Sequence, residues 1–107
     1  MAVLDVNKET FGPEVLEADG TVFVDFYGDG CVPCEALRPH VDAYAETYGD
    51  RIKFCSLNTT RARRLAISQK VLGLPVMAIY QKGKMVESLV KDDATAESIE
   101  AMIQRYL

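Results

Sequence analysis

Residues 21–27, with the sequence TVFVDFY, are the feature that most restricts how this chain can fold. The run is rich in β-branched and aromatic residues and is apolar at nearly every position. A strand with one exposed face alternates apolar and polar side chains, whereas a strand buried on both faces is apolar almost throughout. The segment therefore predicts an internal strand of a sheet that is covered on both sides.

Strand-like and helix-like segments alternate along the rest of the chain, with no repeat, linker or low-complexity tract. We expect strands at about 2–6, 21–27, 52–57, 76–80 and 84–90, and helices at about 7–18, 32–48, 60–71 and 94–106. The sequence QKG at 81–83 indicates a hairpin between the last two strands. This order predicts a single α/β domain over residues 1–107, with a mixed sheet of about five strands and about four helices on its two faces.

Capping and breaking residues indicate where these helices begin and end. Asn7 is the expected N-cap of the first helix, which should be interrupted at Gly12-Pro13. Either Thr59 or Thr60 is expected to cap the third helix. Glycines are the expected stops, Gly49 after the second helix and Gly73 after the third.

Composition excludes several classes of partner. The formal charge of −4 argues against a nucleic-acid-binding surface, which needs clustered Lys and Arg. The N-terminal residues MAVLDVNKETF carry charges too early for a secretory signal, and the longest apolar stretch, 74–80, is too short to span a membrane. We therefore expect a cytoplasmic, monomeric protein that binds neither nucleic acid nor membrane, in a compartment that keeps thiols reduced.

Two cysteines, Cys31 and Cys34, lie where the buried strand turns into the next helix. A helix N-terminus carries free N–H groups and the positive end of the helix dipole, so it stabilises an anion. Thiolate is the reactive form of cysteine, and this location lowers a thiol pKa. Two intervening residues also allow a disulfide to close within one turn, while Pro33 restricts the backbone between the sulfurs.

Three kinds of site compete for this cysteine pair. A zinc or iron–sulfur site normally needs four ligands, and the chain adds only Cys55 and His40 to the pair. A purely structural disulfide would close a very short loop and constrain little unfolded-state entropy. The third possibility is electron exchange with another thiol or disulfide, which is the usual role of a disulfide in a reducing compartment. The pattern favours redox exchange with no bound metal.

Two residues near the pair are unusual for purely structural positions. Asp25 interrupts the buried strand, where a carboxylate is costly without a partner or a function. Burial should raise its pKa, which suits a proton acceptor for Cys34; the alternative is a strand-end Asp that reaches solvent or a backbone N–H. Pro75 begins a strand although it cannot donate a ladder hydrogen bond, which indicates a special turn and allows a cis peptide after Leu74.

The segments that carry these residues resemble the thioredoxin family from end to end. VDFYGDGCVPC resembles the active-site segment, LNTT the following strand end, LGLP the cis-proline loop and KMVESLV the last strand. The resemblance implies the thioredoxin fold and a thiol–disulfide oxidoreductase that reduces protein disulfides. It also implies a reversible Cys31–Cys34 disulfide, no bound cofactor, and a flavin-dependent thioredoxin reductase as electron donor.

The same resemblance assigns roles to individual residues. Cys31 would be the attacking nucleophile, Cys34 the resolving thiol and Asp25 the buried proton carrier. Pro39 would be the family's helix-kinking proline. The surface that contacts substrates would be formed by Gly30, Val32, Pro33, Leu74 and the cis-proline Pro75.

Several positions depart from the usual family pattern. Gly30 stands in place of a tryptophan, Val32 in place of a glycine and Glu35 in place of a lysine. Gly30 removes an aromatic wall, so the sulfur of Cys31 should be more open. Asp29 and Glu35 should raise the pKa of Cys31 by like-charge repulsion. Ser56 replaces a lysine that interacts with the buried Asp in many relatives, and Lys91 replaces a substrate-groove glycine.

These departures point to a narrower group within the family. DGCVPC together with NTTRARRLAISQKVLGLP resembles the thioredoxins of the glycine reductase system. The resemblance implies electron donation to components of a selenoprotein-containing reductase complex. A rival hypothesis from another class is a redox-silent module that uses the groove around Leu74 and Pro75 to hold a peptide.

Three other features have simple structural explanations. Cys55 is expected to be a buried structural thiol rather than a regulatory one. His40 is expected on the surface of a helix. Arg61, Arg63 and Arg64 are expected to form a solvated face, with a docking surface for an acidic partner as the alternative.

Overall fold

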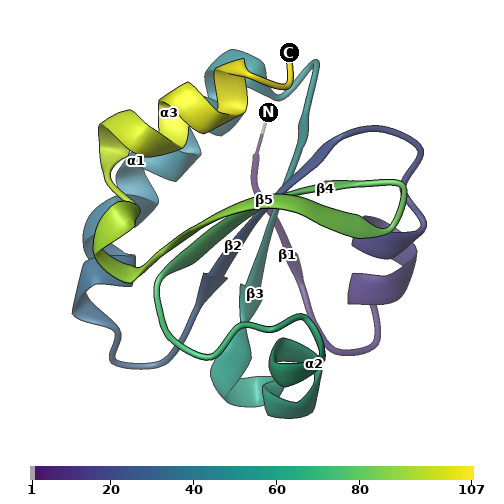
Figure 1. Ribbon diagram of the computed structural model, residues 1–107, viewed down its shortest axis with the longest axis vertical. Helices are drawn as coiled ribbons and strands as arrows, with labels where there is room; N and C mark the ends of the chain where they lie inside the picture. The colour runs from purple at the N-terminus through teal and green to yellow at the C-terminus, as the bar shows by residue number, and fades with distance from the viewer. Residues whose placement is uncertain (1) are drawn as a thin grey trace.

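A computed structural model describes residues 2–107 and contains one five-stranded mixed sheet (Figure 1). The strands are β1 (Leu4–Val6), β2 (Val22–Tyr27), β3 (Lys53–Asn58), β4 (Val76–Gln81) and β5 (Lys84–Val90). Their order in the sheet is β1-β3-β2-β4-β5. The strands β1, β3 and β2 run parallel, while β4 is antiparallel to both β2 and β5. The segment TVFVDFY is thus the central strand, as predicted.

Helices cover both faces of the sheet, as the apolar character of β2 predicts. The helices α1 (Val32–Tyr48) and α3 (Ala96–Gln104) lie side by side on one face in Figure 1. The π-helical turn η1 (Gly12–Leu16) and α2 (Arg63–Ser68) lie on the other. Two short 3-10 turns, η2 (Thr59–Arg61) and η3 (Lys91–Asp93), precede α2 and α3. The four longer helical segments confirm the predicted fold class.

The pleat of β2 divides its side chains between two cores. Val22, Val24 and Phe26 pack with η1 and α2, whereas Phe23 packs with α1 and α3. Side chains alternate between the faces of a strand, so Asp25 is on the same face as Phe23 and is directed toward α1. This alternation brings the buried carboxylate to the helix that begins at the cysteine pair.

The predicted hairpin is present and has a two-residue turn. Lys82 and Gly83 connect β4 to β5 with φ angles of 52° and 79°. Positive φ at both central positions is the geometry whose twist matches that of the paired strands. Lys82 therefore lies at the end of β4 farthest from Pro75.

The region around α2 differs from its prediction. The N-cap of the 3-10 turn is Asn58, and neither Thr59 nor Thr60. The Asn58 side chain accepts the N–H of Thr60. A 3-10 turn comes first, and Ala62 interrupts the helical backbone with φ −150° before α2 begins. The helix then ends at Ser68 because Lys70 adopts a φ of 62°, several residues before the expected stop at Gly73. At the other predicted caps, Asn7 accepts the N–H groups of Glu9 and Thr10, and Gly49 follows the last residue of α1.

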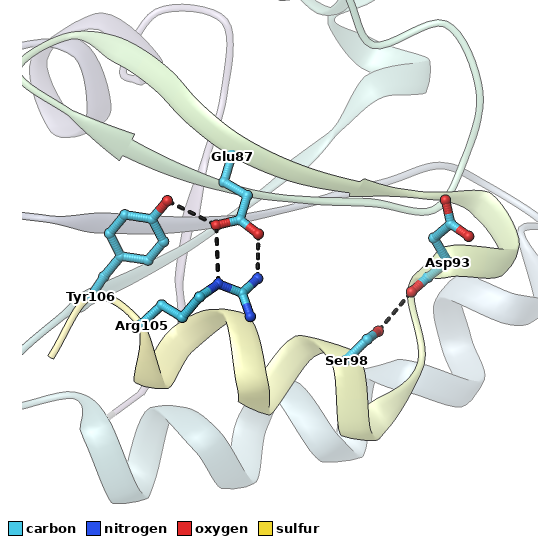
Figure 2. A network of polar contacts seen from close by, with 5 residues as sticks. All are labelled: Glu87, Asp93, Ser98, Arg105 and Tyr106. Atoms are coloured by element: carbon cyan, nitrogen blue, oxygen red, sulfur yellow. Dashed lines mark hydrogen bonds and ion pairs between the residues drawn. The ribbon is translucent and has the colours of Figure 1, made fainter.

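The C-terminal end of α3 is fixed to the sheet by a polar cluster (Figure 2). Arg105 forms an ion pair with Glu87 of β5, and the Tyr106 hydroxyl donates to the same carboxylate at 2.8 Å. At the start of the helix, the Ser98 hydroxyl donates to the carbonyl of Asp93 at 2.6 Å. The Glu87 contacts hold the end of α3 against β5.

Candidate active site

A disulfide joins Cys31 and Cys34 at the beginning of α1. The S–S distance is 2.10 Å and the Cα atoms are 5.2 Å apart. Cys31 is the N-cap, and its Sγ accepts a hydrogen bond of 3.3 Å from the backbone N–H of Cys34. Cys34 is buried, with 3% of its surface exposed, while Cys31 is partly exposed. Cys31 therefore has the more accessible sulfur of the pair, and this sulfur lies at the helix N-terminus, where it accepts a backbone N–H.

The local sequence explains how the turn before the helix is made. Gly30 has a φ of 70°, a left-handed conformation that costs other residues roughly 1–2 kcal/mol. An added Cβ at Gly30 would meet no heavy atom within 4 Å. Pro33 lies in the first turn of α1, where its missing N–H is no loss. The helix then continues through Pro39 to Tyr48. The space that a larger side chain at position 30 would enter is therefore empty.

A cis peptide joins Leu74 to Pro75, which confirms the possibility indicated by the sequence. Phe26 of β2 pairs with Val76 of β4, so Pro75 lies at the same end of the sheet as the turn that leads to Cys31. The Leu74 side chain packs against Gly28, since its Cδ1 would be 2.9 Å from an added Cβ there. Pro75 is buried and Leu74 is half-buried. Val32, in contrast, is 72% exposed.

A cavity of about 300 Å³ lies between the end of β2 and the first turns of α1. Asp25, Cys34 and Arg38 all contribute to its walls. Asp25 is only 1% exposed, and its Oδ1 has no hydrogen-bond partner among residues 2–107. The structure thus brings together the buried carboxylate and the buried sulfur that the sequence analysis singled out separately.

Burial raises the pKa of Asp25 to about 7, because the charged form loses its hydration. The Arg38 guanidinium opposes this shift, and the negative charge of Asp42 adds to it. Arg38 Nε donates to Asp42 Oδ1 at 3.0 Å. The two residues of this ion pair are four apart in sequence and lie on the same face of α1. The pKa of Asp25 therefore lies near neutral pH instead of well below it.

Ser56 stands where many thioredoxins have a lysine that interacts with the buried aspartate. Ser56 is fully buried on β3, directly opposite Asp25 in the sheet register. Its hydroxyl donates to Asp5 Oδ1 of β1 at 2.9 Å, and no hydrogen bond joins it to Asp25. The cation that acts on Asp25 comes instead from α1, as Arg38.

Sequence reasoning missed Arg38, although its spacing contains a signal. Arg38 follows Cys34 by four residues, and residues four apart share a face of a helix. A helix that directs Cys34 toward a buried strand must direct position 38 toward it as well. The arginine could therefore have been predicted as a neighbour of Asp25.

Replacing Arg38 by leucine should raise the pKa of Asp25 further above 7, because the change removes the positive charge that favours the carboxylate and keeps an apolar side chain in its place. A ¹³C NMR titration of the aspartate carboxyl groups measures this directly. Arg64→Leu on α2 is the matched control, since this exposed arginine has no contact with the cavity. An unchanged Asp25 titration in the Arg38 variant would contradict the assignment.

The remaining candidate residues lie outside this cluster. Cys55 is fully buried in β3, and burial raises the pKa of its thiol to about 11, so it is neutral and unreactive. His40 is exposed on α1, as expected. Within residues 2–107, no three His, Cys, Asp or Glu side chains are grouped so that they could hold a metal ion.

A mixed sheet covered on both faces, with a cysteine pair at a helix N-terminus beside a cis-proline, defines a thiol–disulfide oxidoreductase. Comparison with known proteins gives the family. The thioredoxin family model matches residues 2–105. The chain belongs to the thioredoxin family, and it uses the cysteine pair to reduce or oxidise protein disulfides.

Individual relatives extend the same comparison. The chain is 49% identical over 105 residues to a thioredoxin of Acetoanaerobium sticklandii, covering 98% of this chain and 100% of the relative. It is 50% identical over 105 residues to a thioredoxin of Peptoclostridium acidaminophilum, covering 98% and 96%. A chloroplastic M-type thioredoxin of Chlamydomonas reinhardtii is 31% identical, over 95% of this chain and 72% of the relative. In the part of the chain that the structure describes, no helix is long and apolar enough to cross a membrane.

Proposed function

We propose that this protein is a dithiol electron carrier that reduces protein disulfides through attack by Cys31. The observation that carries the proposal is the asymmetry of the pair. Cys31 is the more exposed sulfur and caps the helix, whereas Cys34 is buried against the cavity that contains Asp25. A thiolate is best stabilised at the capping position, so Cys31 is the nucleophile.

The proposed reaction transfers two electrons from the dithiol to the partner. The Cys31 thiolate attacks one sulfur of the partner disulfide, and the other partner sulfur leaves as a thiolate and takes up a proton. Cys34 then attacks Sγ of Cys31 in the mixed disulfide. The second partner sulfur leaves as a thiol, while Cys31 and Cys34 become the disulfide.

Asp25 is the proposed proton acceptor for Cys34 in the second step. A base works best when its pKa is close to the operating pH, and burial brings the pKa of Asp25 to about 7. The cavity that Asp25 and Cys34 share, about 300 Å³, has room for a water molecule to relay the proton. Arg38 at the same cavity prevents the pKa from rising further.

The proposed contact surface for substrates surrounds the exposed edge of the disulfide. It consists of Gly30, Val32, Pro33, Leu74 and Pro75. The openness beside Gly30 and the exposure of Val32 support a partner segment that crosses directly over Cys31. Leu74 and Pro75 would line its other side.

We further propose a flavin-dependent thioredoxin reductase as electron donor and glycine reductase components as acceptors. The support is the resemblance of DGCVPC and of residues 58–75 to thioredoxins of that system. We also propose that residues 1–107 form one domain and that the protein acts as a monomer in the cytoplasm.

The experiment that tests the carrier function is a redox equilibrium of the purified protein against dithiol buffers of graded potential. Because the chain contains no tryptophan, the redox state is read by thiol alkylation and mass. Reversible conversion between dithiol and disulfide at a reducing midpoint supports the proposal. An oxidising midpoint would indicate an oxidase or isomerase instead. A pair that never closes would leave the redox-silent peptide-binding module as the better hypothesis.

A further inference from the structure

The charges of this acidic protein are unevenly distributed along the chain. No Asp or Glu occurs between Asp50 and Glu87, and this interval contains 8 of the 12 Lys and Arg residues. Four of the eight lie around α2, namely Arg61, Arg63, Arg64 and Lys70. The other four lie in or just before β3, as Arg51 and Lys53, or on the β4–β5 hairpin, as Lys82 and Lys84. The interval therefore forms a basic portion in a chain whose formal charge is −4.

The basic side chains around α2 are free to meet a partner. Arg61, Arg63, Arg64 and Lys70 are all exposed. None of them forms an ion pair or a side-chain hydrogen bond with any of residues 2–107, in contrast to Arg38, Lys53 and Arg105. Four neighbouring cations without internal counterions create a positive field at the surface.

An apolar groove lies beside these cations. It has a volume of about 330 Å³ and runs between α2 and the loop that leads to the cis-proline. Ile67 and Leu72 are 61% and 82% exposed at this groove, and Arg63 also lines it. Hydration of such large apolar side chains is unfavourable, so a partner that covers them removes this free-energy cost.

The groove continues to the disulfide. Leu74 forms part of its wall, packs against Gly28 in the turn before Cys31, and is followed by the cis-proline. Lys91 adds a cation at this point, since its side chain packs closely against Gly73. Glu35 is exposed in the first turn of α1, and Asp29 is exposed in the turn before Cys31, where its carboxylate accepts from Asn58 Nδ2.

We propose that the protein whose disulfide is exchanged at Cys31 docks on this α2 surface, defined as Arg61, Arg63, Arg64, Ile67, Lys70 and Leu72. The docking segment carries carboxylates that meet the arginines and an apolar side chain that enters the groove. This inference rests on the proposed function and adds the chemistry of the partner. Charge complementarity selects an acidic segment, and the apolar groove selects a protein rather than a nucleic acid.

Two synthetic peptides test the proposal. Each has one cysteine linked to 2-thiopyridine through a disulfide, an uncharged leaving group, and differs only in a nearby Glu-Leu-Glu or Lys-Leu-Lys segment. The rate of thiopyridone release by the reduced protein is measured by stopped flow. At an ionic strength of about 0.01 M we expect the acidic peptide to react about tenfold faster, and at about 1 M the difference should disappear.

Matched charge reversals separate the α2 surface from the net charge of the protein. Arg63→Glu with Arg64→Glu should reverse the preference toward the basic peptide. Lys82→Glu with Lys84→Glu changes the net charge equally at the distant hairpin and should retain the preference of the unaltered protein.

Several results would overturn the docking proposal. Equal rates for the two peptides in the unaltered protein would show that the reaction proceeds without docking at this surface. Loss of the preference in the hairpin variant would trace it to net charge. Sedimentation of the unaltered protein as a dimer that Arg63→Glu dissociates would assign the surface to a second copy. Tighter binding of a single-stranded DNA oligonucleotide than of the acidic peptide would assign it to nucleic acid. If neither peptide is reduced, the proposed function itself fails.

Discussion

Replacement of Cys34 by serine should leave mixed disulfides between Cys31 and partner proteins that persist instead of resolving. The exchange normally ends when the Cys34 sulfur attacks the bond at Cys31, and a hydroxyl cannot make that attack. The partly exposed Cys31 sulfur remains available for the first step. Non-reducing electrophoresis followed by mass spectrometry of native extract should identify the trapped partners.

Cys31→Ser is the matched comparison and should trap nothing. This variant retains Cys34 and Cys55, which are 3% and 0% exposed, so neither sulfur can readily reach a partner disulfide. Adducts on the Cys31→Ser protein would show that the nucleophile had been assigned to the wrong sulfur. Absence of adducts on both variants would count against the carrier function.

Replacement of Asp25 by alanine should stabilise the oxidised protein by about 4 kcal/mol at pH 8. The folded-state pKa of Asp25 is about 7, above its ordinary value of 3.8, so folding disfavours the ionised form. The resulting loss of stability is absent below the lower value, develops as the pH rises, and is complete above the higher one. Denaturant unfolding at pH 8 and pH 5 should therefore show a difference that shrinks by more than half at pH 5.

Asp19→Ala provides the control for this measurement, since Asp19 is exposed and should change stability little at either pH. The same Asp25 variant should resolve mixed disulfides more slowly near neutral pH, because Cys34 loses its proton acceptor. A stability gain without slower resolution would keep the burial argument and remove the catalytic role. A pH-independent change would contradict the raised pKa itself.

Much of the fold could be predicted because its signals are local. The apolar run of β2 requires cover on both faces, and the cysteine pair follows directly at the point where strand becomes helix. The hairpin is determined by two adjacent residues with positive φ, Lys82 and Gly83. In each of these cases the residues that determine the structure are neighbours in the sequence.

Features that depend on packing between distant segments could not be predicted as fully. The early end of α2 depends on the left-handed conformation of Lys70. Lysine rarely adopts this conformation, so the sequence does not indicate it. The effect of Arg38 on Asp25 requires a helix and a strand to be placed against each other. The same is true of Ser56, whose hydroxyl bonds to Asp5 on the neighbouring strand.

The burial of Cys55 gives the protein an internal indicator of its own integrity. With a pKa of about 11 and no exposed surface, this thiol is shielded from alkylating reagents as long as β3 stays in place. Under native conditions any modified cysteine therefore belongs to the redox-active pair, Cys31 and Cys34. A third modification reports that the sheet has opened, so one mass spectrum distinguishes a reduced molecule from an unfolded one.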